Sequence, residues 1–153
     1  MISSTCPRNR IKSTSRLAFT VLSHMGMAVY RFEDLRVWQA AKRQCDRVGE
    51  LRMRPTFLDD RELSNQMNRA ALSVLFNISE GFLRRVDNET AQFLRYSFAS
   101  NGELKAGYYV ADARKYIIGV ETIELIDLNE SVAKMLRRWQ GTLKSRKPLS
   151  RSR

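Results

Sequence analysis

The stretch RAALSVLFNISEGFLRR, residues 69–85, decides how this chain folds. Its apolar residues Ala70, Val74 and Ile78 recur at the four-residue spacing of an amphipathic helix. Polar residues then arrive directly before a glycine, close to the same side of the helix: Asn77, Ser79, Glu80 and Gly81. Three interpretations of this polar group stay open, namely a structural network at the end of a helix, a subunit or binding contact, and a catalytic site.

Segments with the same helical spacing lie on both sides of this stretch. They run from Phe32 to about Arg52, from Asp59 or Asp60 to about Gly81, from Asp87 or Asn88 to about Tyr116, and from just after Gly119 to Leu143. Pro55 is expected to stop the first helix, and Gly81 and Gly119 to mark turns. No segment has the alternating pattern of a strand. The sequence therefore predicts an all-α fold, an antiparallel up-down-up-down four-helix bundle over residues 30–144.

The positive charge of the chain is concentrated at its two ends. The formal net charge is +11, from 27 basic and 16 acidic residues. Residues 1–26 contain four basic residues and no acid, and residues 144–153 contain five basic residues and no acid. We expect 1–29 to be a disordered or mis-assigned extension, with a transit peptide or a true start at Met25 or Met27 as the alternatives. We expect 145–153 to be a basic disordered tail.

The C-terminal basic residues are candidates for contact with nucleic acid, because lysine and arginine release counterions when they neutralise phosphates. These candidates are Lys144, Arg146, Lys147, Arg151 and Arg153.

The predicted helices lack the residue sets of common catalytic and metal sites. His24 is the one histidine of the chain, and it lies in the N-terminal extension. Nucleophile–histidine pairs, the usual zinc sites and the Glu-x-x-His pairs of di-iron bundles are therefore not expected. We predict no catalytic residue, metal, cofactor or small-molecule substrate. Cys6 and Cys45 match no metal or redox spacing, and no apolar run is long enough to span a membrane. The cytoplasm, a reducing compartment, is the expected location.

The polar group of the opening stretch needs partners. A glutamate near a helix C-terminus faces an unfavourable dipole, and a buried asparagine without partners costs about 1–3 kcal/mol. Arginines near Glu80 in sequence are available to neutralise it: Arg69, Arg84, Arg85 and Arg95. We predict a structural polar layer or subunit contact made of Arg69, Ser73, Asn77, Glu80, Gly81 and Glu103.

The aromatic residues suggest a second surface besides the core. Tyr108 and Tyr109 are adjacent, and adjacent residues of a helix point about 100° apart, so at least one of them lies outside the core. Tyrosine and tryptophan are enriched in subunit contacts. The sequence therefore predicts a homo-oligomer.

Three ordered motifs resemble a known family. They are YRFEDLRVWQAA at 30–41, the pattern from Arg69 to Gly81, and Phe93-Leu94 followed by Ser100 and Glu103-Leu104. They resemble the bacterial four helix bundle proteins, also called 23S rRNA intervening-sequence proteins, over roughly 30–143. Ser79, Ala99 and Lys105 depart from the family pattern, in which alanine, glycine and an acid are usual.

This resemblance implies a ring of antiparallel four-helix bundles, a homopentamer, without established enzymatic activity. Similar bundles accompany reverse transcriptases and bind nucleic acid as a basic ring. We therefore expect a non-enzymatic oligomer that binds RNA or a nucleic-acid-processing partner. The alternative is a scaffold that binds a partner and no nucleic acid.

Overall fold

The computed structural model describes residues 29–84 and 86–145, and over these ranges its regular structure is entirely helical. The elements are η1 (Phe32–Asp34), α1 (Arg36–Arg52), α2 (Pro55–Asp59), α3 (Arg61–Leu83), α4 (Asp87–Ala113) and α5 (Val120–Ser145). The prediction of an all-α fold is confirmed. Most residues of the predicted N-terminal extension and of the predicted C-terminal tail lie outside the described ranges.

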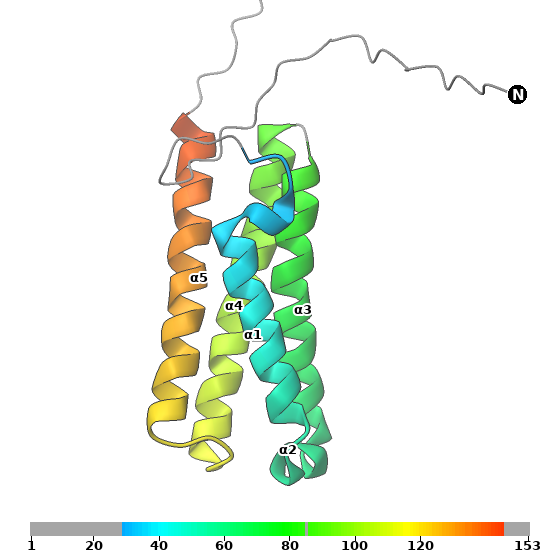
Figure 1. Cartoon of the computed structure of the whole chain (residues 1–153), viewed down its shortest axis with the longest axis vertical. Helices are drawn as coiled ribbons and strands as arrows, with labels where there is room; N and C mark the ends of the chain where they lie inside the picture. Colours follow the sequence, from blue (N-terminus) through cyan, green and yellow to red (C-terminus); the bar gives the residue numbers. More distant parts are fainter. Residues whose placement is uncertain (1–28, 85, 146–153) are drawn as a thin grey trace, which may run out of the picture.

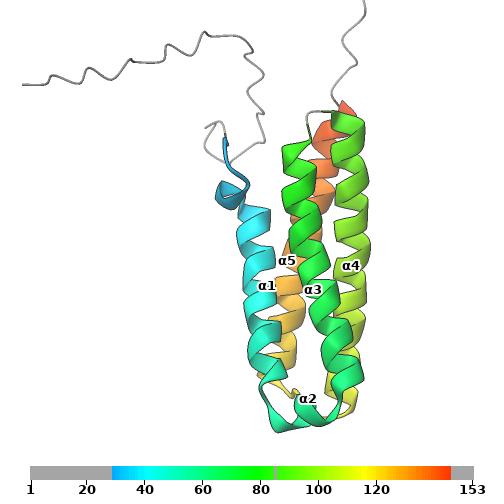
Figure 2. The same cartoon turned by 90° about the vertical axis from the view of Figure 1, so that its right-hand side faces the viewer.

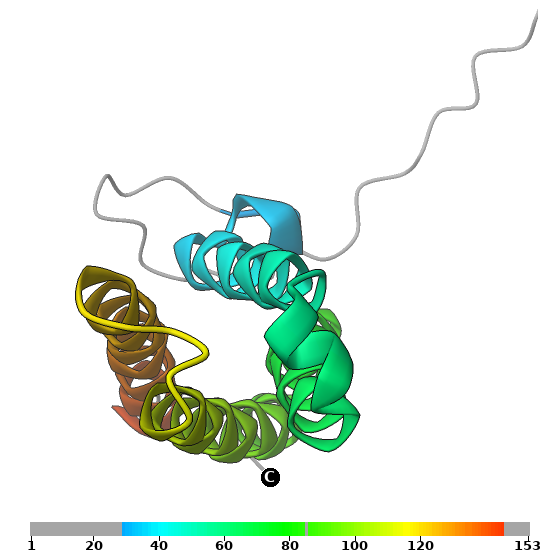
Figure 3. The same ribbon diagram turned by 90° about the horizontal axis from the view of Figure 1, so that it is seen from below.

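The four long helices lie side by side along the longest axis of the molecule (Figure 1). The view along that axis shows them around a common centre (Figure 3), and each packs on two neighbours, with α3 between α1 and α4 and with α5 between α4 and α1. The short helix α2 joins α1 to α3 at one end (Figure 2). Val29 packs against the core cluster that also contains Leu143, near the C-terminal end of α5.

The start of α3 follows from its capping residue. Asp60 occupies the N-cap position, and its side chain accepts a hydrogen bond of 3.2 Å from the backbone N–H of Leu63. The first helix ends at Arg52, three residues before Pro55, but this proline also opens α2. Helix α2 was not predicted, and it brings Phe57 into the core with 1% of its surface exposed.

The connection between α3 and α4 differs from the expectation. Helix α3 continues to Leu83, so Gly81 lies inside it, and α4 begins at Asp87 with Val86 at its N-cap. Asp87 and Asn88 are therefore the first helical residues and not the cap. At the other end, α4 stops at Ala113, before Tyr116, and Gly119 makes the predicted turn with a φ of 59°.

The core has two apolar parts. One contains residues from the α2 end of the long helices, among them Leu51, Met67, Leu104 and Leu125. The other contains residues from the opposite end, among them Leu35, Ile78, Leu94 and Leu136. Tyr108 is fully buried, whereas Tyr109 is 52% exposed. This confirms that at least one of the two adjacent tyrosines lies outside the core.

Candidate functional site

The predicted polar residues do not form a single layer. They are spread along the seam between α3 and α4 in separate groups. Near the start of the seam, Arg69 donates a hydrogen bond of 2.6 Å to Gln66, and Gln66 donates to Glu103 of α4. Glu103 is thus part of the Arg69 group and is not joined to Glu80 by a hydrogen bond or ion pair. All three side chains of this group are solvent-accessible.

Asn77 lies at the edge of the seam, half-buried, rather than in the core. Its side-chain amide donates to the carbonyl of Ser73 at 2.7 Å and to the Ser73 hydroxyl at 3.1 Å. The hydroxyls of Ser73 and Ser100 share a hydrogen bond of 2.8 Å, which links α3 to α4. The cost expected for an unsatisfied asparagine is therefore avoided by bonds within its own helix.

Glu80 is neutralised by Arg84, four residues further along the chain and directly after the end of α3. The guanidinium of Arg84 also lies 3.7 Å from Glu89 and sits over the ring of Phe93, with 4.9 Å from its carbon to the ring centre. Arg95 bonds to Gln92 instead. The unfavourable position of Glu80 near the helix C-terminus is thus offset by an ion pair of the favourable i,i+4 spacing.

Gly81 allows α3 and α4 to approach each other closely. It is buried, and a Cβ atom added to it would lie 3.2 Å from the Cβ of Phe93 and 3.5 Å from the carbonyl oxygen of Thr90. Its φ is not in the left-handed region. The interpretation of Gly81 as a left-handed helix terminus is therefore wrong, and its role is contact between backbones.

A buried polar network lies elsewhere, on α1, α4 and α5. The amide of Gln44 donates to the side-chain oxygen of Asn101 at 3.0 Å. Asn101 and Asn129 exchange side-chain hydrogen bonds of 3.0 and 3.2 Å, and each amide also donates to the other residue's backbone carbonyl. All three residues are at most 2% exposed.

The sequence contains a signal for this network. Each of the three polar residues occupies a position of the apolar stripe of its helix, between buried residues three, four or seven positions away. Asn129, for example, lies between Leu125 and Val132. The network divides the two apolar parts of the core, where buried polar groups fix the register of packed helices.

Two further contacts tie α1 to α3. The indole N–H of Trp38 donates to the hydroxyl of Ser79 at 2.9 Å, which gives Ser79 a structural role. The thiol of Cys45 donates to the carbonyl of Ala71 at 3.2 Å, and burial raises the pKa of this thiol to about 11. Cys45 is therefore a half-buried residue packed against the core, and its thiol stays protonated at neutral pH.

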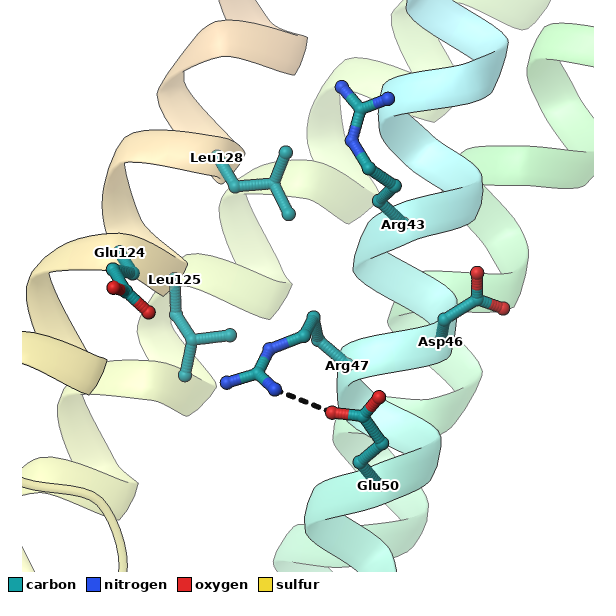
Figure 4. Close-up of a pocket in the computed structure, with 7 residues that line it drawn as sticks. All are labelled: Arg43, Asp46, Arg47, Glu50, Glu124, Leu125 and Leu128. Atoms are coloured by element: carbon teal, nitrogen blue, oxygen red, sulfur yellow. Dashed lines mark hydrogen bonds and ion pairs between the residues drawn. The ribbon is translucent and has the colours of Figure 1, made fainter.

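A groove of about 360 Å³ lies between α1 and α5 (Figure 4). Its lining residues are Arg43, Asp46, Arg47, Glu50, Glu124, Leu125 and Leu128. At the end of the groove nearest α2, Arg54 donates two hydrogen bonds to Glu121, and Arg47 bonds to both Glu50 and Glu121. The bonds from Arg54 lower the pKa of the Glu121 carboxyl. The charges at this end are thus paired with one another.

Among the described residues there is no group of histidine, cysteine and acidic side chains able to hold a metal ion. No helix within the described ranges is long and apolar enough to cross a membrane.

Of the predicted nucleic-acid contacts, Lys144 lies exposed in the last turn of α5. Arg146, Lys147, Arg151 and Arg153 lie outside the described residues.

The comparison with curated proteins gives no match. The comparison with protein families gives a match that covers most of the helical region. Residues 33–138, from η1 into the last third of α5, match the family described as 23S rRNA-intervening sequence protein. This range contains the first motif from Glu33 onward and the whole of the other two, and it contains the buried network of Gln44, Asn101 and Asn129. The chain belongs to the 23S rRNA-intervening sequence protein family.

Proposed function

We propose that this protein is a non-enzymatic module of the cytoplasm. In this proposal the chain is an antiparallel up-down-up-down four-helix bundle that assembles into a homopentamer and binds nucleic acid or a nucleic-acid-processing partner. Family membership supports a small helical protein of this kind.

The main support for the proposed assembly comes from the outward face of α4. The outward side of this helix carries five small or apolar residues, with the exposed charges of Arg95 and Glu103 among them: Ala99, Gly102, Ala106, Val110 and Ala113. All are exposed, and Tyr96 and Tyr109 beside them are 50% and 52% exposed. Contiguous exposed apolar surface of this kind is typical of contacts between subunits. We call these five residues the α4 stripe.

The outward side of α3 also exposes large apolar residues. Phe76 and Leu83 are each 62% exposed, although a solvated helix usually presents charged or polar side chains outward. By contrast, the outward side of α5 carries Asp127, Glu130 and Lys134. A second copy is the occupant that we propose for the α4 stripe, because the exposed tyrosines beside it are of the residue type that is enriched in subunit contacts.

The nucleic-acid contact is assigned to the C-terminal basic residues. In a pentamer, five positive charges on each tail amount to about 25 charges on one assembly, and weak single contacts then gain from multivalency. The described residues contain 18 basic and 16 acidic side chains, so the body of the protein contributes little net charge.

Changing all five tail residues to glutamine (Lys144, Arg146, Lys147, Arg151 and Arg153) is expected to weaken binding to single-stranded RNA. Each lost phosphate contact lowers the slope of log affinity against log salt by about 0.7. Fluorescence anisotropy over a salt series measures this slope. A variant with Arg146, Arg151 and Arg153 changed to lysine keeps the charge and should bind as the unaltered chain does. An unchanged slope in the glutamine variant would contradict the role of the tail.

The second candidate function is a partner-binding scaffold without nucleic acid. The near balance of charge over the described residues favours it. A chain beginning at Met27, tested by filter binding at low salt, separates the two candidates. Salt-sensitive retention of RNA supports the first, and no retention supports the second.

A further inference from the structure

One side of the molecule is formed by α1 and α5. In the half of this side away from α2, both helices have a segment that contains basic residues and no acid. Residues 35–45 contain three basic residues and no acid, and residues 131–145 contain four basic residues and no acid. These two segments belong to neighbouring helices and share one part of the core, which includes Ala40, Val132 and Leu136. They lie at the end of the molecule away from α2 (Figure 1).

The direction of the side chains follows from the groove between α1 and α5 (Figure 4). Arg43 and Glu50 line this groove, and Arg36 precedes Arg43 by seven residues, which is nearly two full turns. On α5, Glu124 lines the same groove, and Arg138 follows it by two steps of seven residues. Arg36, Arg43 and Arg138 therefore continue the groove toward the end of the molecule away from α2.

Arg137 faces a different neighbour. Its guanidinium carbon lies 4.9 Å from the centre of the Phe98 ring of α4. Because adjacent residues of a helix point about 100° apart, Arg138 is turned away from this contact. Lys134 is four residues before Arg138, so these two side chains are neighbours on the helix surface.

The basic side chains in this half of the side lack bonded partners, although Lys134 lies near the Glu130 carboxylate, which is bonded to Lys105. Arg36, Arg43, Lys134 and Arg138 are exposed, and none of them makes a hydrogen bond or ion pair with another residue in 29–84 or 86–145. In the half nearest α2, by contrast, Arg47 and Arg54 are both paired with Glu121. We call the four unpaired residues the α1–α5 basic face.

We infer that the α1–α5 basic face binds the phosphodiester backbone of a nucleic acid strand. Four exposed cations without internal partners are complementary to a row of phosphates. Arg36 and Arg43 are about 10.5 Å apart along the helix axis, so their guanidinium groups can contact different phosphates of one strand. Lys144 lies six residues beyond Arg138 on α5, so the face leads toward the basic tail. This inference rests on the proposed function, and it adds a contact on the folded body.

Contact with phosphates alone predicts binding that depends on salt and not on base sequence. In the full chain, the double variant Arg43→Gln/Arg138→Gln should therefore lower the salt slope by about 1.4 for single-stranded RNA, since each contact contributes about 0.7. The decrease should be the same for RNAs of different sequence. The control Arg61→Gln/Lys115→Gln removes the same charge from the end of the molecule near α2, and its slope should not change.

A second double variant, Arg36→Gln/Lys134→Gln, uses the other two residues of the face and should give the same decrease. All these side chains are exposed, so the melting temperatures should stay the same. If both face variants keep the slope of the unaltered chain, the inference is wrong, while the proposed function stands. If the unaltered chain shows no salt-sensitive binding, both the inference and the nucleic-acid contact of the proposed function are wrong. A loss confined to one RNA sequence would also overturn the inference, because it would indicate base recognition.

Discussion

Replacing Asn101 with alanine is expected to lower the free energy of unfolding by about 2–6 kcal/mol. The substitution removes the acceptor of the Gln44 amide and the donor to the side-chain oxygen of Asn129. Two buried polar groups are then left without partners, at about 1–3 kcal/mol each. Urea unfolding followed by circular dichroism, at one fixed protein concentration, measures the change.

The control for this experiment is Asn88→Ala, near the start of the same helix, where the side chain is exposed. Its cost should stay within about 0.5 kcal/mol. Replacing the whole network, with Gln44→Met, Asn101→Leu and Asn129→Leu together, should recover most of the lost stability, because no buried group is then left unpaired. If Asn101→Ala cost no more than Asn88→Ala, the network would not be a stabilising feature.

Ala106→Arg is expected to break the assembly into single subunits. Ala106 is the central residue of the α4 stripe, and an arginine there would place an unpaired charge in the proposed contact. Leaving a charge buried without its partner costs about 3–5 kcal/mol, and every 1.4 kcal/mol changes a dissociation constant tenfold. The dissociation constant of each contact should therefore rise by at least a hundredfold. Light scattering coupled to size-exclusion chromatography measures the mass.

The helix itself should tolerate this change, because arginine is nearly as good a helix former as alanine. Thr56→Arg, in the exposed part of α2, adds the same charge away from the four long helices and should leave the mass unchanged. An Ala106→Arg protein with the mass of the unaltered assembly would show that the α4 stripe is not the contact.

The helices were predictable because each buries a stripe of apolar residues with helical spacing. The stripe of α3 at Leu63, Met67, Ala70, Val74 and Ile78 is buried throughout, as predicted. The errors lie at helix ends, where two physical effects compete for the same residue. Pro55 can stop one helix or open another, and here it opens α2 three residues after α1 ends.

Gly81 and the polar residues show why the candidate site was harder to predict. A glycine late in a helix suggests a left-handed terminus, but the same residue also permits close packing, and only the position of Phe93 and Thr90 separates these roles. Ser73 and Asn77 were singled out from the sequence, and both lie half-buried at the seam between α3 and α4. Their separation from Glu80 depends on which partners α4 presents, and the sequence of α3 alone does not contain that information.

The central claim is that this chain assembles through an exposed apolar face, and the mass of the full chain in solution tests it most directly. One chain has a mass of 17.8 kDa, so five copies give about 89 kDa. Light scattering at micromolar protein concentration should give that value. A mass of 17.8 kDa under the same conditions would contradict the claim.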